Sequence, residues 1–274
     1  MPIVREKQAN LAKASEMICQ VAQKIESRPL LVCLPEFFNT LYVTEYFRMN
    51  AETIPNGETS ICLSNLSKEL KIFICGGSIP ELDPDDQTIL YNTCTFWSPE
   101  GNLLGTYRKL HMGDGDSRDC SSVKESGIFT GGSNLTTVAI GRAKVGIGIC
   151  YDVHFEEMWR IYRNLGCNLL LIPAAWPIST GSLFAEVCQR ARAVDTQSFV
   201  AMISPARDVK SEYVTWGHSA VVDPNGIVIS CARAGEEAIV VPIDLTVCDN
   251  SRTKRRTFEE RRTDIYETIL KKKQ

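Results

Sequence analysis

The sequence has few histidines, no cysteine motif for metal or redox chemistry, and no long apolar run. Its 274 residues include 11 cysteines and 3 histidines, yet no Cys-x-x-Cys pair occurs. This spacing argues against a zinc site and against the disulfide framework of a small secreted domain. No apolar run has the length needed to cross a bilayer, and the N-terminus lacks a signal-peptide pattern. We therefore expect a soluble cytoplasmic protein, with the mitochondrial matrix left open.

Charge and glycine patterns exclude further classes. A net charge of -3 gives no support for a nucleic-acid or membrane partner. The run at Gly131 lacks the Gly-Lys-Ser/Thr ending of a phosphate loop, and Gly146 and Gly148 lack the third glycine of a dinucleotide fingerprint. We therefore expect no cofactor.

The segment from Asp114 to Glu125 partly resembles a calcium-binding loop. Arg118 falls where a ligand is required, and Asp119 falls where the sharp turn requires glycine. The pattern therefore does not support a metal site, and residues 112–127 are better interpreted as a mobile loop that borders a pocket.

Predicted helices and strands alternate along the chain, with two hairpins inserted. This order favours one α/β domain over residues 1–274, with residues 251–274 as a C-terminal arm. The predicted helices include residues 9–27, 58–70, 156–165 and 183–196. The predicted strands include residues 30–34, 72–79, 144–149, 168–173 and 237–241.

The most informative stretch ends at Cys150. An apolar, glycine-bearing run precedes this cysteine, so a buried strand would place the thiol at its carboxyl end, where ligands bind in such sheets. Asp152 could cap the following helix, whose dipole would favour the thiolate. The alternative is a small buried hydrophobic residue at a strand end.

Two more polar residues follow apolar runs. Glu36 comes directly after the strand that ends at Pro35, and Lys109 ends the second arm of a hairpin. A carboxylate could take the thiol proton from Cys150, and an ammonium could stabilise an oxyanion together with the backbone N–H of Tyr151. Solvated surface charges are the alternative reading of both residues.

A cysteine-histidine hydrolase is a second chemical solution. Any of the three histidines could act as the base for Cys150 in such a site. The candidates are His111, His154 and His218.

Three motifs together resemble the nitrilase, or carbon-nitrogen hydrolase, superfamily. They are Pro35-Glu-Phe37, Tyr107-Arg-Lys-Leu-His111 and Gly148-Ile-Cys-Tyr-Asp152. The resemblance implies an αββα sandwich of two mixed β-sheets flanked by helices, and a homodimer. It also implies that Glu36, Lys109 and Cys150 form a catalytic triad that makes a thioester and releases ammonia, with Glu125 as a supporting glutamate.

Further stretches are most similar to the ω-amidase branch of that superfamily. They are Ser179-Thr-Gly181, Arg190–Asp195 and Ser204–Asp208. The similarity implies hydrolysis of the terminal amide of short dicarboxylic monoamides such as α-ketoglutaramate and α-ketosuccinamate. It places Tyr42, Trp176 and Thr180 in the substrate pocket, although both aromatic residues could instead belong to the core. A catalytically weak binding protein and a carbamoyl or nitrile hydrolase are the alternative functions.

The chain departs from the family pattern at three places. It starts after the position of the family's first strand, so we expect that strand to be absent. His154 stands where the family commonly has arginine, and Leu183-Phe184 stands where a His-Trp pair is usual. These changes leave the pocket shape and the choice of substrate open.

Overall fold

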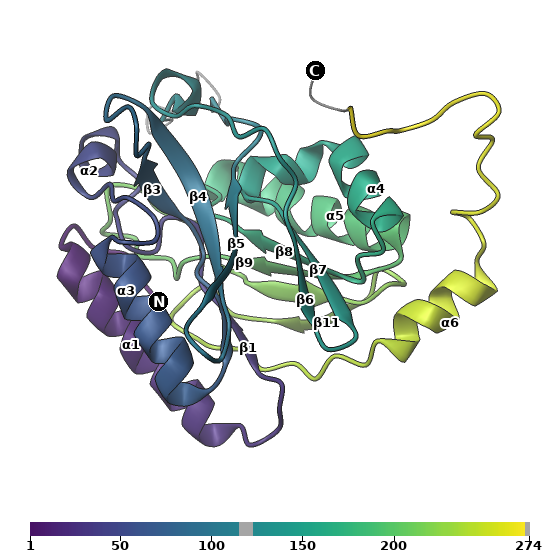
Figure 1. The fold of residues 1–274 in the computed structure, drawn as a ribbon, viewed down its shortest axis with the longest axis horizontal. Helices are drawn as coiled ribbons and strands as arrows, with labels where there is room; N and C mark the ends of the chain where they lie inside the picture. Colours follow the sequence, from purple (N-terminus) through teal and green to yellow (C-terminus); the bar gives the residue numbers. More distant parts are fainter. Residues whose placement is uncertain (115–122, 272–274) are drawn as a thin grey trace.

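Two β-sheets face each other, and helices cover their outer faces (Figure 1). This computed structural model describes residues 1–114 and 123–271. The four layers confirm the predicted αββα sandwich of two mixed sheets.

The first sheet follows the order β1-β2-β4-β3, with β5 also paired to β4. Its strands are β1 (Leu31–Cys33), β2 (Phe73–Cys75), β3 (Ile79–Leu82), β4 (Leu90–Trp97) and β5 (Leu103–Arg108). β1 is parallel to β2 and lies at the edge of the sheet, and the other pairs are antiparallel. Helices α1 (Lys7–Lys24) and α3 (Glu58–Leu70) cover the outer face, with apolar residues such as Ile18 and Leu63 turned inward.

The second sheet follows the order β11-β10-β9-β8-β7-β6. Its strands are β6 (Thr137–Ile140), β7 (Ala143–Ile147), β8 (Leu169–Pro173), β9 (Phe199–Ile203), β10 (Ala220–Val222) and β11 (Val228–Cys231). Because β7, β8 and β9 are mutually parallel, their carboxyl ends lie at one edge of the sheet. Helices α4 (Glu156–Asn164) and α5 (Ile178–Thr196) cover its outer face (Figure 1).

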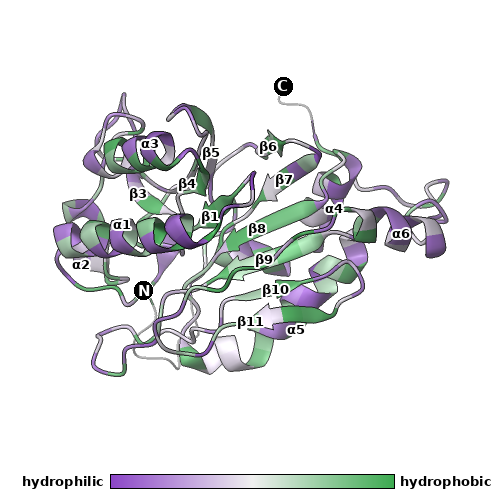
Figure 2. Ribbon diagram, turned by 90° about the horizontal axis from the view of Figure 1, so that it is seen from below, coloured by the Kyte–Doolittle hydropathy of each residue, from purple (hydrophilic) through white to green (hydrophobic). Residues whose placement is uncertain are grey.

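The main core lies between the two sheets. Phe96 and Tyr107 from the first sheet and Ile147 and Leu171 from the second are at most 1% exposed. Figure 2 shows the apolar colouring concentrated on the central strands, with polar residues on the outer helices. Burial of this apolar surface stabilises the fold by roughly 25 cal/mol per Å² and holds the sheets against each other.

The predicted strand 72–79 is two strands in the structure. Gly76 and Gly77 separate β2 from β3, and Gly77 has a φ of +59°. A Cβ atom at Gly77 would lie 2.1 Å from the carbonyl oxygen of Pro35, so only glycine fits beside the end of β1. The turn also places Ser78 where its Oγ accepts a hydrogen bond from the backbone N–H of Phe37 at 3.2 Å. The turn between β2 and β3 therefore supports the segment that holds Glu36.

The predicted strand 237–241 is wrong. The residues around it alternate between half-buried and exposed, as in a strand, and Ile239 and Val241 are the half-buried ones. Their backbone groups nevertheless make no hydrogen bond to the described part of the chain, because β11 pairs with β10 alone. An alternating sequence forms a strand only where a partner offers a backbone edge.

The four predicted helices are present in the structure, but not all of them begin and end where the sequence predicted. α5 begins at Ile178 rather than at residue 183, since the low helix propensity of Gly181 obscured its first turn. Helices α2 (Thr44–Met49) and α6 (Thr246–Lys254) were missed. Within residues 1–114 and 123–271, no helix has the length and hydropathy needed to span a membrane.

The chain after α6 runs outside the layered body (Figure 1). No strand precedes α1, and the carbonyl of Met1 accepts a hydrogen bond from the backbone N–H of Ala206 at 2.8 Å. The single domain over residues 1–274, its arm at 251–274 and the homodimer stay predictions.

We expect Gly148→Ala to destabilise the fold by about 1–3 kcal/mol, because the site is already fully packed. The added Cβ would lie 2.5 Å from a ring carbon of Trp159, which is itself buried. Gly127→Ala is the control, because no atom lies within 4 Å of a Cβ there, and its change should stay within about 0.5 kcal/mol. Urea unfolding measures both changes, and equal stability of the two variants would contradict the packing argument.

Candidate active site

Cys150 follows β7 and starts a short 3-10 turn, η2 (Cys150–His154). Its φ of +45° lies in the left-handed region. A residue other than glycine adopts this conformation at a cost of about 1–3 kcal/mol. Asp152 stabilises the turn, because its carboxylate accepts hydrogen bonds from the N–H of Ile149 at 2.9 Å and from the Tyr107 hydroxyl at 2.7 Å. The thiol is therefore held in a defined position at the end of a buried strand.

The sequence suggested that Asp152 is the N-cap of the next helix, but the structure places another residue there. Phe155 occupies that position, and α4 begins at Glu156. The α-helix thus starts six residues after Cys150, so the expected stabilisation of the thiolate by its dipole does not apply. The local spacing was misleading because a 3-10 turn occupies the intervening residues.

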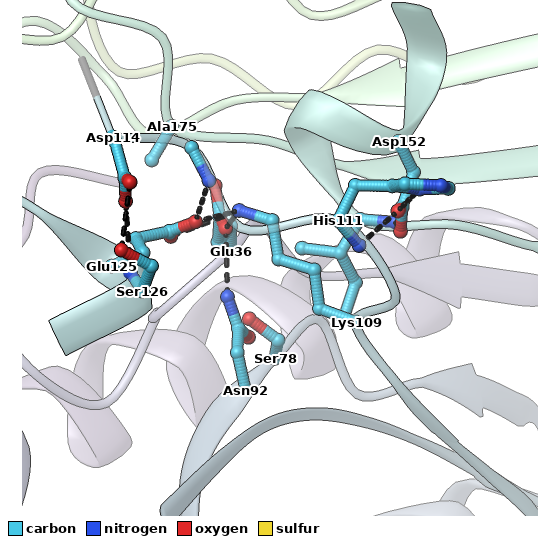
Figure 3. A network of polar contacts seen from close by, with 12 residues as sticks. Glu36, Ser78, Asn92, Lys109, His111, Asp114, Glu125, Ser126, Asp152 and Ala175 are labelled. Carbon is cyan, nitrogen blue, oxygen red and sulfur yellow. Dashed lines mark hydrogen bonds and ion pairs between the residues drawn. The ribbon is translucent and has the colours of Figure 1, made fainter. Parts of the chain in front are cut away.

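The structure brings the predicted triad together around a buried lysine. Lys109 Nζ lies 3.0 Å from Glu36 Oε1 and 2.9 Å from Glu125 Oε1. The side chains of Lys109, Glu36 and Glu125 are at most 1% exposed. Figure 3 shows the ammonium of Lys109 pointing toward the carboxylates of Glu36 and Glu125. The supporting glutamate predicted at Glu125 is thus placed in direct contact with the lysine.

Charge pairing controls the protonation of this group. Burial alone would lower the pKa of Lys109, but the charges of Glu125 and then Glu36 outweigh it and raise that pKa well above its usual value. Burial also raises the pKa of Glu36, with Lys109 lowering it and Glu125 raising it. The lysine therefore stays charged, and the Glu36 carboxyl is a stronger base than an exposed glutamate.

The thiol of Cys150 is protonated in the resting site. Burial and then the charge of Glu36 raise its pKa well above the usual value, while Lys109 and the backbone N–H of Ala175 lower it. The nearby thiol in turn lowers the pKa of Glu36. The geometry therefore suits a thiol that gives its proton to Glu36 as it reacts.

Asn92 is a site residue that sequence reasoning missed. It lies on β4, is fully buried, and donates from Nδ2 to Glu36 Oε1 at 2.9 Å (Figure 3). Its Oδ1 has no hydrogen-bond partner in the described residues. An asparagine inside the apolar strand was a usable signal, because a buried amide without a partner is costly.

Two further donors hold Glu125. The Tyr42 hydroxyl donates to Oε1 at 2.8 Å, and the backbone N–H of Gly113 donates to Oε2 at 2.6 Å. Burial and then Glu125 raise the pKa of Tyr42 well above its usual value, so the phenol keeps its proton and donates. Tyr42 therefore acts on the supporting glutamate as well as lining the pocket.

Residues 115–122, which include Arg118 and Asp119 of the calcium-like pattern, lie outside the described residues. Of the described members, Asp114 accepts hydrogen bonds from the backbone and hydroxyl of Ser126 at 2.9 and 2.7 Å. Glu125, at the start of the 3-10 turn η1 (Glu125–Gly127), contacts Lys109 instead. These two acids thus serve separate local contacts.

A cavity of about 660 Å³ opens beside Cys150. This volume lies in the range of small-molecule sites. The four predicted pocket or oxyanion residues all line it, namely Tyr42, Tyr151, Trp176 and Thr180. Phe155 and Tyr213 are lining residues that the sequence did not indicate. Met112 belongs to the loop 112–127 that was predicted to border a pocket, and Phe184 belongs to the Leu183-Phe184 departure from the family pattern.

No histidine takes the place of Glu36 as a partner of the thiol. Within the described residues, none of His111, His154 and His218 makes a hydrogen bond to Cys150. His111 instead contacts Asp152 at 2.7 Å. The geometry therefore favours the carboxylate-lysine arrangement over a cysteine-histidine pair.

Glu36→Gln should lower the pKa of Cys150, because it removes a negative charge that raises it. We expect alkylation of Cys150 by iodoacetamide near pH 8 to become faster by about threefold to tenfold, since one pKa unit changes the thiolate fraction tenfold. Peptide-level mass spectrometry measures the rate, with the exposed Cys231 as the internal control. A rate at Cys150 that is unchanged or lower would contradict this electrostatic assignment.

Comparison with known proteins agrees with the motifs. The sequence profile described as "Carbon-nitrogen hydrolase" matches residues 1–253. The Homo sapiens protein Omega-amidase NIT2 is 41% identical over 266 residues, which make up 97% of this chain and 94% of that protein. Omega-amidase NIT2-B of Xenopus laevis is 43% identical over 267 residues, with the same two coverages of 97% and 94%.

A solved structure also resembles this fold closely. Nit3 of Saccharomyces cerevisiae, described as a member of branch 10 of the nitrilase superfamily, superposes with a TM-score of 0.86. The two sequences are 34% identical, and the match covers 95% of this chain and 93% of that chain.

Proposed function

Because the chain belongs to the carbon-nitrogen hydrolase family, we propose that it cleaves the terminal amide of short dicarboxylic monoamides through a thioester on Cys150. The family resemblance of the three motifs is confirmed, and the chain is an amidohydrolase that acts on carbon-nitrogen bonds. α-Ketoglutaramate and α-ketosuccinamate represent the proposed substrate class.

One observation carries the proposal. Lys109 is buried between Glu36 and Glu125 beside the thiol of Cys150, at a cavity of small-molecule size. A nucleophile, a base and a fixed positive charge are the groups that acyl transfer from an amide requires.

In the first step the Cys150 thiol transfers its proton to the Glu36 carboxylate, and the sulfur attacks the amide carbonyl carbon. A carbon-sulfur bond forms, and the carbonyl oxygen becomes an oxyanion. The ammonium of Lys109 and the backbone N–H of Tyr151 stabilise this oxyanion. Glu125 holds Lys109 in place and keeps it charged.

In the second step the carbon-nitrogen bond breaks. Glu36 returns its proton to the leaving nitrogen, which departs as ammonia, and the acyl group stays on Cys150 as a thioester. Glu36 is a carboxylate again after this step, so it can act as a base a second time.

In the third step a water molecule gives a proton to Glu36 and attacks the thioester carbonyl. The carbon-sulfur bond breaks, the dicarboxylic acid leaves, and the proton on Glu36 returns to Cys150. During this sequence Tyr42, Trp176 and Thr180 contact the substrate chain in the cavity.

The decisive test is ammonia release from α-ketoglutaramate by the unmodified protein and by Cys150→Ala. We expect the variant to lose activity by about 10³-fold or more, because no other group replaces the covalent nucleophile. Its fold should be unchanged, because the substitution removes only one sulfur atom. Circular dichroism checks the fold of the variant.

Parallel assays with an N-carbamoyl amino acid and an aliphatic nitrile test the alternative substrates of the same chemistry. Higher kcat/KM for either would reassign the substrate class but keep the nucleophile. Full ammonia release by Cys150→Ala would refute the mechanism. A folded protein that forms no acyl adduct with any of these compounds would instead be a binding protein.

A further inference from the structure

A second, smaller cavity borders Glu36. Its volume is about 20 Å³, whereas the substrate cavity beside Cys150 has a volume of about 660 Å³. One water molecule requires roughly 10–15 Å³, so the smaller cavity has room for a single water. We call it the rear cavity, and besides Glu36 its lining includes Ala206, Asp208, Ser211 and Thr215.

The two cavities share a wall. Tyr42, Ala175 and Tyr213 line both of them. The rings of Tyr42 and Tyr213 stack with their centroids 4.4 Å apart and an angle of 26° between their planes. The Tyr42 hydroxyl donates to Glu125 at 2.8 Å, and the Tyr213 hydroxyl donates to the carbonyl of Ala175 at 2.8 Å. Because both rings are anchored, a substrate chain can fill the substrate cavity while the rear cavity keeps its shape.

The base and the nucleophile border different cavities. Glu36 is part of the rear lining, whereas Cys150 is part of the substrate-cavity lining. Oε1 of Glu36 accepts hydrogen bonds from Lys109 at 3.0 Å and from Asn92 at 2.9 Å. Oε2 is buried and has no hydrogen-bond partner among the described residues. Oε2 is therefore the oxygen that remains available to accept a proton.

Ala175 lies between the rear cavity and the nucleophile. It lines both cavities, and its backbone N–H is close enough to the thiol of Cys150 to lower the pKa of that thiol. The rear cavity therefore approaches the reacting sulfur to within about the thickness of a single residue.

The rear cavity also has a polar connection to the surface. The Thr215 hydroxyl lies 3.3 Å from the carbonyl oxygens of Pro205 and Ala206 and donates toward them, so its oxygen can still accept a hydrogen bond from water. Asp208 and Ser211 are half-buried, so the lining reaches solvent at these two residues. Water that enters here finds the polar partners that a buried water requires.

We propose that the rear cavity supplies the hydrolytic water to Glu36 while the acyl group on Cys150 fills the substrate cavity. The inference rests on the proposed amidase function and gives its second substrate, water, a separate route. The amide enters on one side of the shared wall, and water enters on the other.

Hydrolysis of the thioester is the step that uses this route. Ammonia has left by then, and the acyl chain still occupies the substrate cavity. A water from the rear cavity gives a proton to Oε2 of Glu36, and its oxygen forms a bond to the carbonyl carbon. The carbon-sulfur bond breaks, and the proton passes from Glu36 to the sulfur of Cys150. The step balances with water as its only added reactant.

An ester separates formation of the thioester from its hydrolysis. p-Nitrophenyl hydrogen glutarate forms the same glutaryl thioester as glutaramate, but its leaving group departs more easily. The initial burst of p-nitrophenol therefore measures formation of the thioester, and the steady-state rate measures its hydrolysis. A narrower rear cavity should slow the steady-state rate alone.

Two substitutions narrow the rear cavity from different parts of its lining. Ser211→Leu acts at the half-buried end, and Ala206→Val acts at a buried position. We expect each to lower the steady-state rate by about tenfold, the effect of losing one hydrogen bond to a charged group. The burst rate should stay within about twofold, because the substrate cavity is unchanged.

Lys210→Leu is the matched control. Lys210 is exposed, precedes Ser211 in the same loop and is not part of the rear lining, so it receives the same new side chain outside the cavity. We expect both phases to stay within about twofold in this variant. Circular dichroism checks the fold of all three variants.

A crystal structure of the unmodified protein provides a second measurement. We expect an ordered water in the rear cavity, and we expect Ser211→Leu and Ala206→Val to exclude it. A rear cavity without ordered water in the unmodified protein would overturn the proposal. An unchanged steady-state rate in both narrowed variants would overturn it as well. Equal loss of burst and steady-state rates would show a general structural effect and would also count against a water route.

The outcomes separate this inference from the function on which it rests. Ammonia release from α-ketoglutaramate that requires Cys150, with steady-state ester hydrolysis unaffected by narrowing of the rear cavity, would remove the water route and keep the amidase. Absence of both ammonia and a p-nitrophenol burst from the unmodified protein would instead refute the proposed function.

Discussion

The ion pairs of Lys109 with Glu36 and Glu125 are the interaction on which the site depends. Removing an ion from water costs several kcal/mol, and all three groups are buried. The arrangement is tolerable only because each charge has a partner within about 3 Å. Since the three residues come from separate segments, any shift between those segments would leave a buried charge unpaired. The packed core between the sheets is what prevents such a shift.

Strand β5 connects the two halves of the site. β5 ends just before Lys109, and Tyr107 near its end donates a hydrogen bond to Asp152 in the turn that begins at Cys150. The first sheet thus places the charged lysine and also stabilises the strained nucleophile of the second sheet. This connection explains how a left-handed conformation at Cys150 persists, because the hydrogen bonds of Asp152 and the surrounding packing over-determine it.

The charged group around Lys109 and the outer lining of the cavity lie in different parts of the structure, and Tyr42 contacts both. The charged group that surrounds Lys109 is buried and rigid, whereas His154 and Thr180 lie on short turns and a helix start around the cavity. Substitutions in this outer part can change the accepted substrate without disturbing the ion pairs, because they share no contact with them.

The sequence by itself determined an α/β fold class through its alternating helix and strand patterns, and it placed Glu36, Lys109 and Cys150 each after an apolar run. The αββα sandwich and the grouping of these three residues as a triad followed from the resemblance of their motifs to the carbon-nitrogen hydrolase family. Such runs are encoded by neighbouring residues, and buried strands place their ends at a common edge. Asn92 was not identified, since its role arises only when β4 passes beside Glu36. Residues 237–241 show the reverse case, because their alternation is local while a strand requires the backbone of a distant partner. The tertiary structure alone decided these two points, since hydrogen bonds between segments remote in sequence leave no local pattern.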